Sequence, residues 1–183
     1  SEEESGTATK SALPSDAQLF SEMSVNTDPN VSVSDSISQP KVNVTSLDLS
    51  KATNLTTIGE ESFKDIDLTN INFGDNSNLE TIGNSAFEYN KISGEIVIPK
   101  SVTTIGDYAF RGNQISSLTF TENNNLSLLG TQAFNGNQIS NLVFGENSSL
   151  SAIGNGAFGS NQISDLTISS GITSIENEAF QNN

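Results

Sequence analysis

Residues 137–158 read NQISNLVFGENSSLSAIGNGAF, and the phenylalanine that ends this stretch belongs to a repeat that organises most of the chain. Phenylalanine recurs at this position at intervals of 24, 23, 24, 24 and 22 residues, as Phe63, Phe87, Phe110, Phe134, Phe158 and Phe180. A serine or an alanine precedes each phenylalanine, and Ile-Gly or Leu-Gly stands upstream in all but the last repeat. Self-similarity at a fixed period of about 20–50 residues is typical of stacked-repeat proteins.

The apolar residues of one repeat predict the path of its backbone. Ile139, Leu142 and Phe144 form an apolar run whose end alternates as a half-buried strand does. The segment 150–158 returns to the core, with a tight turn at Gly154 where a Cβ would obstruct the backbone. One repeat buries too little apolar surface to offset the entropy lost in ordering it, so the repeats must stack.

We therefore predict a β-rich solenoid, a right-handed coil of about six repeats of 22–24 residues. One parallel sheet is expected on the strand side, and short 3₁₀ or turn segments are expected on the return side. The predicted strands centre on Leu47–Leu49, Ile71–Phe73, Ile96–Ile98, Leu118–Phe120, Leu142–Phe144 and Leu166–Ile168.

The chain divides at about residue 40. Residues 1–40 are rich in Ser, Glu, Asp and Thr and are expected to form an acidic tail or linker, while 41–183 form the solenoid. Part of the tail should cap the first coil, through a short helix from Ser15 or an edge strand at 31–37. The repeat pattern stops at Asn183 where a seventh strand would begin, which predicts a solenoid cut from a longer protein.

An asparagine column follows the phenylalanine column by three residues. We expect its side chains to form a buried ladder that satisfies backbone groups at a coil corner, rather than a polar stripe that binds a ligand. Ile66 takes this place in the first repeat, so the ladder should begin in the second. Its members are Asn90, Asn113, Asn137, Asn161 and Asn183.

Strand alternation predicts which side chains point outward from the sheet. These side chains are short, polar and mildly acidic, and the plainer interpretation of them is a solvated face. The candidate ligand-binding residues on this face are Asn70, Asn72, Glu95, Ser117, Thr119, Asn141, Val143, Asp165 and Thr167. Binding hot spots favour Tyr and Arg, so Tyr89, Tyr108 and Arg111 near the coil corners are alternative anchors on a lateral surface.

Composition argues against several classes of function. The net charge is −15, with −6 in residues 1–40 and −9 in the remainder, which disfavours nucleic acid and anionic lipid. Neither Cys nor His is present, so the usual zinc, haem and nucleophilic catalytic residues are missing and no metal, cofactor or enzyme activity is expected. No apolar run approaches the roughly 18–20 residues of a membrane span.

Three further patterns in the sequence are candidate sites. Asp65 and Asp67 could act as acid and base, but no insertion between repeats would form a pocket around them. Single acids in Asn- and Ser-rich turns, such as Glu122, are better explained as solvated turns than as calcium ligands. A return-side threonine column could bind an ordered surface such as ice, but Leu128 and Ala152 interrupt it.

The series IxxLxFxxNxxLxxIGxxAFxxN, with its Ile-Val-Ile-Pro variant at 96–99, resembles the BspA-like (Treponema-type) leucine-rich repeats of bacterial surface proteins. The resemblance covers about residues 44–183, and it departs from the family where these repeats carry Asn in place of a frequent Cys. It implies a curved solenoid with a concave strand face, an extracellular location on a bacterial cell surface, and adhesion.

The function expected from the resemblance is recognition of a protein or glycan on a host cell, a neighbouring cell or a matrix. The alternative is a structural spacer that holds another domain away from the cell wall. The acidic tail and the missing cap after the last repeat are the features that favour the spacer.

Overall fold

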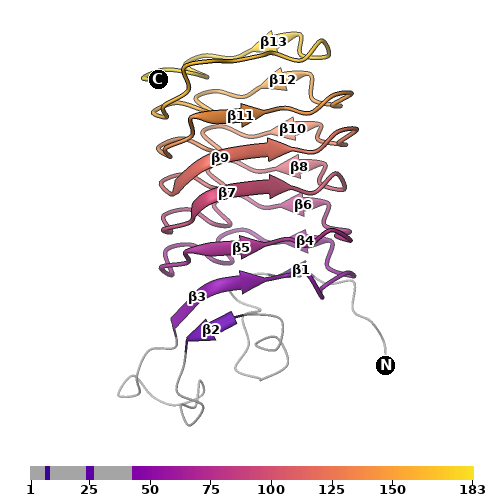
Figure 1. Ribbon diagram of the computed structural model, residues 1–183, viewed down its shortest axis with the longest axis vertical. Helices are drawn as coiled ribbons and strands as arrows, with labels where there is room; N and C mark the ends of the chain where they lie inside the picture. Colours follow the sequence, from indigo (N-terminus) through magenta and orange to yellow (C-terminus); the bar gives the residue numbers. More distant parts are fainter. Residues whose placement is uncertain (1–6, 9–23, 27–42) are drawn as a thin grey trace.

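The structure, a computed structural model, describes residues 7–8, 24–26 and 43–183. The chain winds as a stack of coils, each of which passes once along a strand side and once along a return side (Figure 1). The strand side carries β3 (Asn43–Asp48), β5 (Asn70–Asn72), β7 (Ser93–Ile98), β9 (Gln114–Phe120) and β11 (Asn141–Val143). The return side carries two-residue strands: β4 (Thr57–Ile58), β6 (Thr81–Ile82), β8 (Thr104–Ile105), β10 (Leu128–Leu129), β12 (Ala152–Ile153) and β13 (Ser174–Ile175).

All pairs between successive coils are parallel, which confirms the predicted solenoid class. On the return side the order is β1-β4-β6-β8-β10, where β1 is Thr7–Ala8 of the N-terminal segment, with β12-β13 as a separate pair. On the strand side β3 pairs with β5, and β7-β9-β11 form a second sheet. The register advances by one repeat at each step, since Leu118 lies opposite Ile96 on one side and Leu142 on the other.

The prediction of one continuous sheet of six strands is wrong in two respects. The strand side is split between β5 and β7, where plain backbone hydrogen bonds such as Lys91 N to Leu68 O (2.8 Å) join the coils. The third repeat has an additional residue before Ile96, and the register shifts between Gly94, whose φ is 75°, and Glu95. In this β-bulge the ladder between β7 and β9 passes over Ser116, since Gly94 pairs with Ile115 and Glu95 pairs with Ser117.

The sixth strand, predicted at Leu166–Ile168, is not formed. Leu166 is 38% exposed, whereas the equivalent Leu118 is fully buried. The last coil has a neighbour on one side only, so its strand segment receives neither a second ladder of hydrogen bonds nor a second packing face. The return side has the expected turn segments, together with two-residue strands, in the part of the chain that the structure describes.

The N-terminal segment contributes two short strands to the first coil. β1 (Thr7–Ala8) pairs in parallel with β4, and β2 (Ser24–Asn26) pairs antiparallel with β3. Antiparallel pairing covers the outer edge of the first strand without the long crossover that a parallel pair requires. The expected helix from Ser15 and the expected edge strand at 31–37 lie outside the described residues.

The phenylalanine column is the core of the solenoid. Successive rings are stacked with centroids 5.4, 5.1, 4.9, 5.8 and 5.5 Å apart, from Phe63 to Phe180. Strand phenylalanines meet this stack edge-on: Phe120 against Phe134 at 89° and Phe144 against Phe158 at 80°. Offset stacking and edge-on contact are both favourable ring geometries, so one column packs efficiently in both directions.

The Ile-Gly turn allows the coils to approach closely. A Cβ added to Gly154 would lie 2.5 Å from the carbonyl oxygen of Leu129 in the preceding coil, and one on Gly130 would lie 2.5 Å from the backbone nitrogen of Asp107. Only a residue without a side chain fits such a contact. The predicted role of Gly154 is confirmed.

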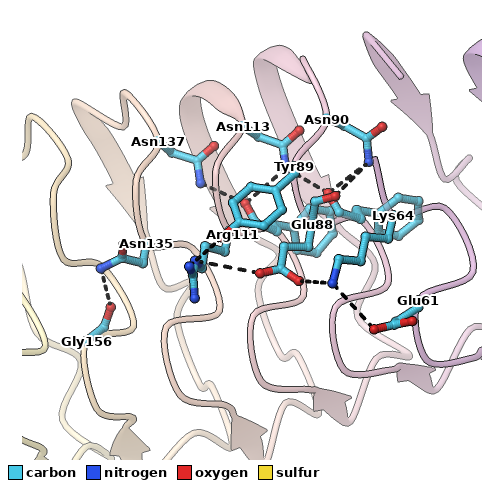
Figure 2. Close-up of polar contacts among 12 residues, drawn as sticks. Glu61, Lys64, Glu88, Tyr89, Asn90, Arg111, Asn113, Asn135, Asn137 and Gly156 are labelled. Atoms are coloured by element: carbon cyan, nitrogen blue, oxygen red, sulfur yellow. Dashed lines mark hydrogen bonds and ion pairs between the residues drawn. The ribbon is translucent and has the colours of Figure 1, made fainter. Parts of the chain in front are cut away.

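The asparagine column forms the expected buried ladder, and Figure 2 shows three of its members in a row. Asn137 Oδ1 accepts a hydrogen bond from Ile115 N at 3.1 Å, while its Nδ2 donates to Phe110 O at 2.9 Å and Phe134 O at 3.1 Å. Each carboxamide therefore joins its own coil to the preceding one. The ladder begins at Asn90, as predicted from Ile66, and is buried as far as Asn161. Asn183 in the last coil is exposed, contrary to the prediction, although its Oδ1 still accepts from Ile163 N at 3.0 Å.

A second ladder, which the sequence did not indicate, follows the Ile-Gly turn. Asn84 Oδ1 accepts from Asp107 N at 2.8 Å, and Asp107 Oδ1 accepts from Thr131 N at 2.8 Å. Asn155 repeats the bond with Asn177 N at 3.1 Å. Side chains before and after the column phenylalanine therefore hydrogen-bond to the backbone of a neighbouring coil.

Replacement of Phe134 by alanine should destabilise the protein by about 3–5 kcal/mol, because the ring is fully buried between Phe110 and Phe158. Phe180→Ala is the control: its ring is partly exposed in the last coil and stacks on one neighbour, so the loss should be smaller. Denaturant unfolding followed by circular dichroism measures both. Equal losses would show that the central stack adds nothing beyond local burial.

Asn137→Ala should cost about 1–3 kcal/mol, because it leaves Ile115 N and two phenylalanine carbonyls without these partners. Asn135→Ala is the matched control in the same corner, since Asn135 is half-buried and its side chain makes one long bond of 3.4 Å to Gly156 O. The denaturant midpoint should fall for the first variant and hardly move for the second. A midpoint unaffected by Asn137→Ala would contradict the ladder.

Candidate binding surface

The strand face carries the predicted outward columns. Seven of the nine candidate residues are exposed, and Ser117 and Thr119 are half-buried. Register brings Glu95, Ser117 and Asn141 side by side in one column. Thr119 lies beside Val143 in the other column.

The remaining four candidates lie apart from this group. Asn70 and Asn72 belong to the separate sheet of β3 and β5, opposite Ser46 and Asp48. Asp165 and Thr167 are exposed in the last coil, where the predicted strand is not formed. The structure therefore places all nine outward but does not join them in one ladder.

Side chains of the strand face bond mainly to one another. Asn141 Nδ2 donates to Ser117 Oγ at 3.1 Å, and Thr119 Oγ1 donates to Glu95 Oε1 at 3.4 Å. Val97 and Val143, 44% and 42% exposed, interrupt this polar surface with two apolar patches on either side of Thr119. The arrangement is a shallow, rigid surface with few strong anchors.

At the first coil this face is also acidic. Asp48 Oδ1 accepts a hydrogen bond from Ser50 N at 2.9 Å. Hydrogen bonds from Ser50, from its side chain above all, lower the pKa of Asp48, so its carboxylate is negative at neutral pH.

A second surface lies at the coil corners beside the N-terminal ends of the strands, and we call it the tyrosine corner: Lys64, Glu88, Tyr89, Tyr108 and Arg111. Figure 2 shows Lys64, Glu88, Tyr89 and Arg111 of this group. The Arg111 guanidinium carbon lies 5.2 Å from the ring centroid of Tyr89 and 5.1 Å from that of Tyr108. Its Nη2 donates a hydrogen bond to Tyr89 Oη. The structure thus brings together the three lateral residues that the sequence analysis singled out.

Glu88 connects the tyrosine corner across three coils. Its side chain is 6% exposed, and its carboxylate forms ion pairs with Lys64 Nζ at 3.3 Å and with Arg111 Nε at 3.7 Å. Lys64 also meets Glu61 at 3.4 Å. The hydrogen bond to Glu88 raises the pKa of Lys64, which keeps this side chain charged.

Sequence reasoning missed Lys64 and Glu88, although a signal for them was present. Lys64, Glu88 and Arg111 each follow a column phenylalanine directly, so they occupy one position in three successive repeats. Opposite charges at a spacing of one repeat meet across the stack, as opposite charges do across paired strands. The alternation Lys, Glu, Arg in that column predicts the ion-pair row.

The remaining candidate patterns are the aspartate pair and the return-side threonine column. Asp65 and Asp67 are both exposed, and Asp67 pairs with Lys91 at 3.2 Å. Thr57, Thr81 and Thr104 align in register on the return side, next to Leu128, which is 54% exposed.

The residues that the structure describes were also compared with the requirements of a metal site and of a membrane span. No group of three or more Asp, Glu, His or Cys residues is placed to hold a metal there. Within the same ranges the structure has no helix of the length and apolar character that crossing a membrane requires.

A family model described as the BspA type leucine rich repeat region, with 6 copies, matches residues 32–147 and 80–183. Comparisons with curated proteins and with solved structures found no match. Stacked repeats of this kind typically provide an extended surface for interaction rather than an enclosed catalytic pocket. The match spans well over half of the chain, and the parallel coils, the phenylalanine stack and the asparagine ladder account for its repeat pattern in physical terms. The chain belongs to the BspA-type leucine-rich repeat family.

Proposed function

We propose that this chain is an adhesion module of a bacterial cell surface, which recognises a protein or glycan on another cell or matrix. The observation that carries the proposal is the regular outward presentation of side chains in register on the strand face. The coils beneath them are fixed by buried stacking and buried hydrogen bonds. A rigid row of this kind binds without the entropy cost of ordering its own residues.

The charge of the chain favours certain partners. A net charge of −15 attracts surfaces with basic patches and repels acidic ones. Capture should therefore weaken as salt is raised, because exposed charges are screened over about 8 Å at physiological ionic strength. Short polar side chains give little energy per contact, so a single copy should bind at roughly micromolar affinity, and clustered copies should bind more tightly through avidity.

The test of the strand face replaces four exposed residues of β7 and β11 by lysine. Beads coated with the wild type or the variant are offered to cultured epithelial cells, bacterial cells and immobilised matrix proteins. Attachment of the variant should fall by at least about tenfold, since contact with the face is blocked and its charge is reversed. The substitutions are Glu95→Lys, Val97→Lys, Asn141→Lys and Val143→Lys.

The matched control places the same added charge on the return side, where attachment and thermal melting should stay as in the wild type. Attachment that survives on the strand-face variant would move the site to the rim. Wild-type beads that attach to nothing would refute adhesion and favour a spacer. The control substitutions are Glu80→Lys, Ser127→Lys, Leu128→Lys and Ser151→Lys, all at exposed positions.

A further inference from the structure

Two tyrosines occupy backbone positions that disfavour them. Tyr89 has φ of 57° and Tyr108 has φ of 60°, in the left-handed region where a bulky side chain is an outlier. The position of Tyr89 is glycine in the next two coils, Gly112 and Gly136, and that of Tyr108 is Gly156 two coils later. Both corner positions have positive φ in every coil, so the conformation belongs to the repeat, and the tyrosines differ from their equivalents in the size of the side chain. The other residues at these positions that are not glycine are Glu61, Asp65, Ser85, Gln132, Ser160, Glu178 and Asn182.

The neighbouring coil leaves space for the Tyr89 ring. A Cβ added to Gly112 would lie 2.6 Å from Tyr89 Cδ1, so the ring fits there only because the next coil has glycine at the equivalent corner position. The Tyr89 side chain remains 44% exposed, although Arg111 lies over its ring. The corner thus holds a large ring in a fixed place and leaves nearly half of it accessible.

Arg111 is held as firmly as the ring. Its guanidinium lies near both tyrosine rings. It also bonds to the Tyr89 hydroxyl and pairs with the buried Glu88 carboxylate (Figure 2). A side chain that is already ordered loses little entropy when a partner binds. Tyrosine and arginine in a fixed arrangement are the residue types that dominate binding hot spots.

The surroundings favour a protein as the partner. Small and amide side chains flank the anchors at the same corner of the following coils: Gly112, Asn135, Gly136 and Ser160. Antibody paratopes, which recognise folded proteins, have a similar composition, with Tyr and Arg as rigid anchors among Ser, Gly and Asn. Asp65, which is exposed, adds negative charge next to the anchors, since its backbone N donates to Glu88 O at 2.9 Å.

We propose that Tyr89 and Arg111, supported by Tyr108, form the anchor site for a protein partner, which places an apolar or aromatic side chain against Tyr89 with Lys or Arg beside it. The inference rests on the proposed function, because it assumes that the chain is a binding module. It differs in placing the strongest contacts at the tyrosine corner rather than on the strand face.

The decisive variant is Tyr89→Gly. Glycine adopts a φ of 57° without strain, so the melting temperature should stay the same or rise while the anchor is lost. Ser160→Gly is the matched control, because Ser160 has a φ of 53° at the same corner position of another coil. It relieves the backbone equally and leaves the tyrosine corner intact.

The probe is a phage-displayed library of short random peptides selected on the immobilised wild-type chain. Enriched peptides should combine an aromatic or aliphatic residue with Lys or Arg. They should bind Tyr89→Gly at least about tenfold more weakly and bind Ser160→Gly as well as the wild type. Peptides that bind Tyr89→Gly at full strength, or a selection that enriches none, would overturn the inference.

A second variant separates binding from a merely structural role. Arg111→Lys keeps the charge facing Glu88 but loses the planar guanidinium that lies over the tyrosine rings, so peptide binding should fall here too. A lower melting temperature in Tyr89→Gly, with full peptide binding retained by Arg111→Lys, would make the corner a structural staple and overturn the inference.

The bead assay distinguishes this inference from the proposed function. Wild-type and Tyr89→Gly beads are offered to cells whose surface proteins have been removed by protease and to cells whose glycans have been oxidised by periodate. Protease treatment and Tyr89→Gly should each abolish attachment. Beads of Tyr89→Gly that attach normally, or attachment lost only after periodate, would overturn the inference and leave adhesion standing. Wild-type beads that attach nowhere would overturn both.

Discussion

The hydrogen bonds from the asparagine carboxamide of one coil to the backbone of the preceding coil are the interaction on which the rest of the structure depends. The corner around each phenylalanine has no strand ladder, yet it buries backbone groups that must find hydrogen-bond partners. Phe110 O receives two amide N–H groups, from Asn113 at 3.1 Å and from Asn137 at 2.9 Å, while Asn137 Oδ1 binds Ile115 N. Without these bonds, burial of the phenylalanine would leave its backbone carbonyl desolvated and unpaired. Each such unpaired group costs about 1–3 kcal/mol of stability. The ring stack and the amide ladder are therefore two parts of one solution.

The same corner determines what the surface can display. Each coil turns with two residues of positive φ, one on either side of the phenylalanine, such as Gln132 and Gly136 around Phe134. Side chains between and beside these turns emerge at one-repeat spacing, which is how Lys64, Glu88 and Arg111 come to form an ion-pair row across three coils. Variation at the corner changes the surface without disturbing the core, because the carboxamide and the ring stay in place.

Sequence periodicity predicts what every coil shares. The phenylalanine stack, the asparagine ladder with its start at Asn90 and the close approach at Gly154 each follow from a residue type repeated at a fixed spacing. The family and fold class follow from the same columns. What periodicity misses is specific to single coils: the strand side divides between β5 and β7, and in the last coil Leu166 is exposed and its strand is not formed. The outward direction of the candidate residues was predictable, but their separation into groups was not, because it depends on those two breaks.

The tyrosine corner was only half predictable for a related reason. Tyr89, Tyr108 and Arg111 stand out by residue type, but their contact requires the αL turns and the small Gly112 of the next coil. An αL conformation costs a residue other than glycine about 1–3 kcal/mol, and two tyrosines bear it here. The cation–π contacts of Arg111 with the two rings offset part of this conformational cost, by about 0.5–1 kcal/mol for an exposed contact. Positive φ at these two positions is common to every coil, so the conformation alone does not single out the tyrosines. The tyrosine corner is distinguished because a guanidinium contacts two aromatic rings there, with Gly112 leaving space for the Tyr89 ring and Glu88 pairing with Arg111, while Tyr89 stays accessible.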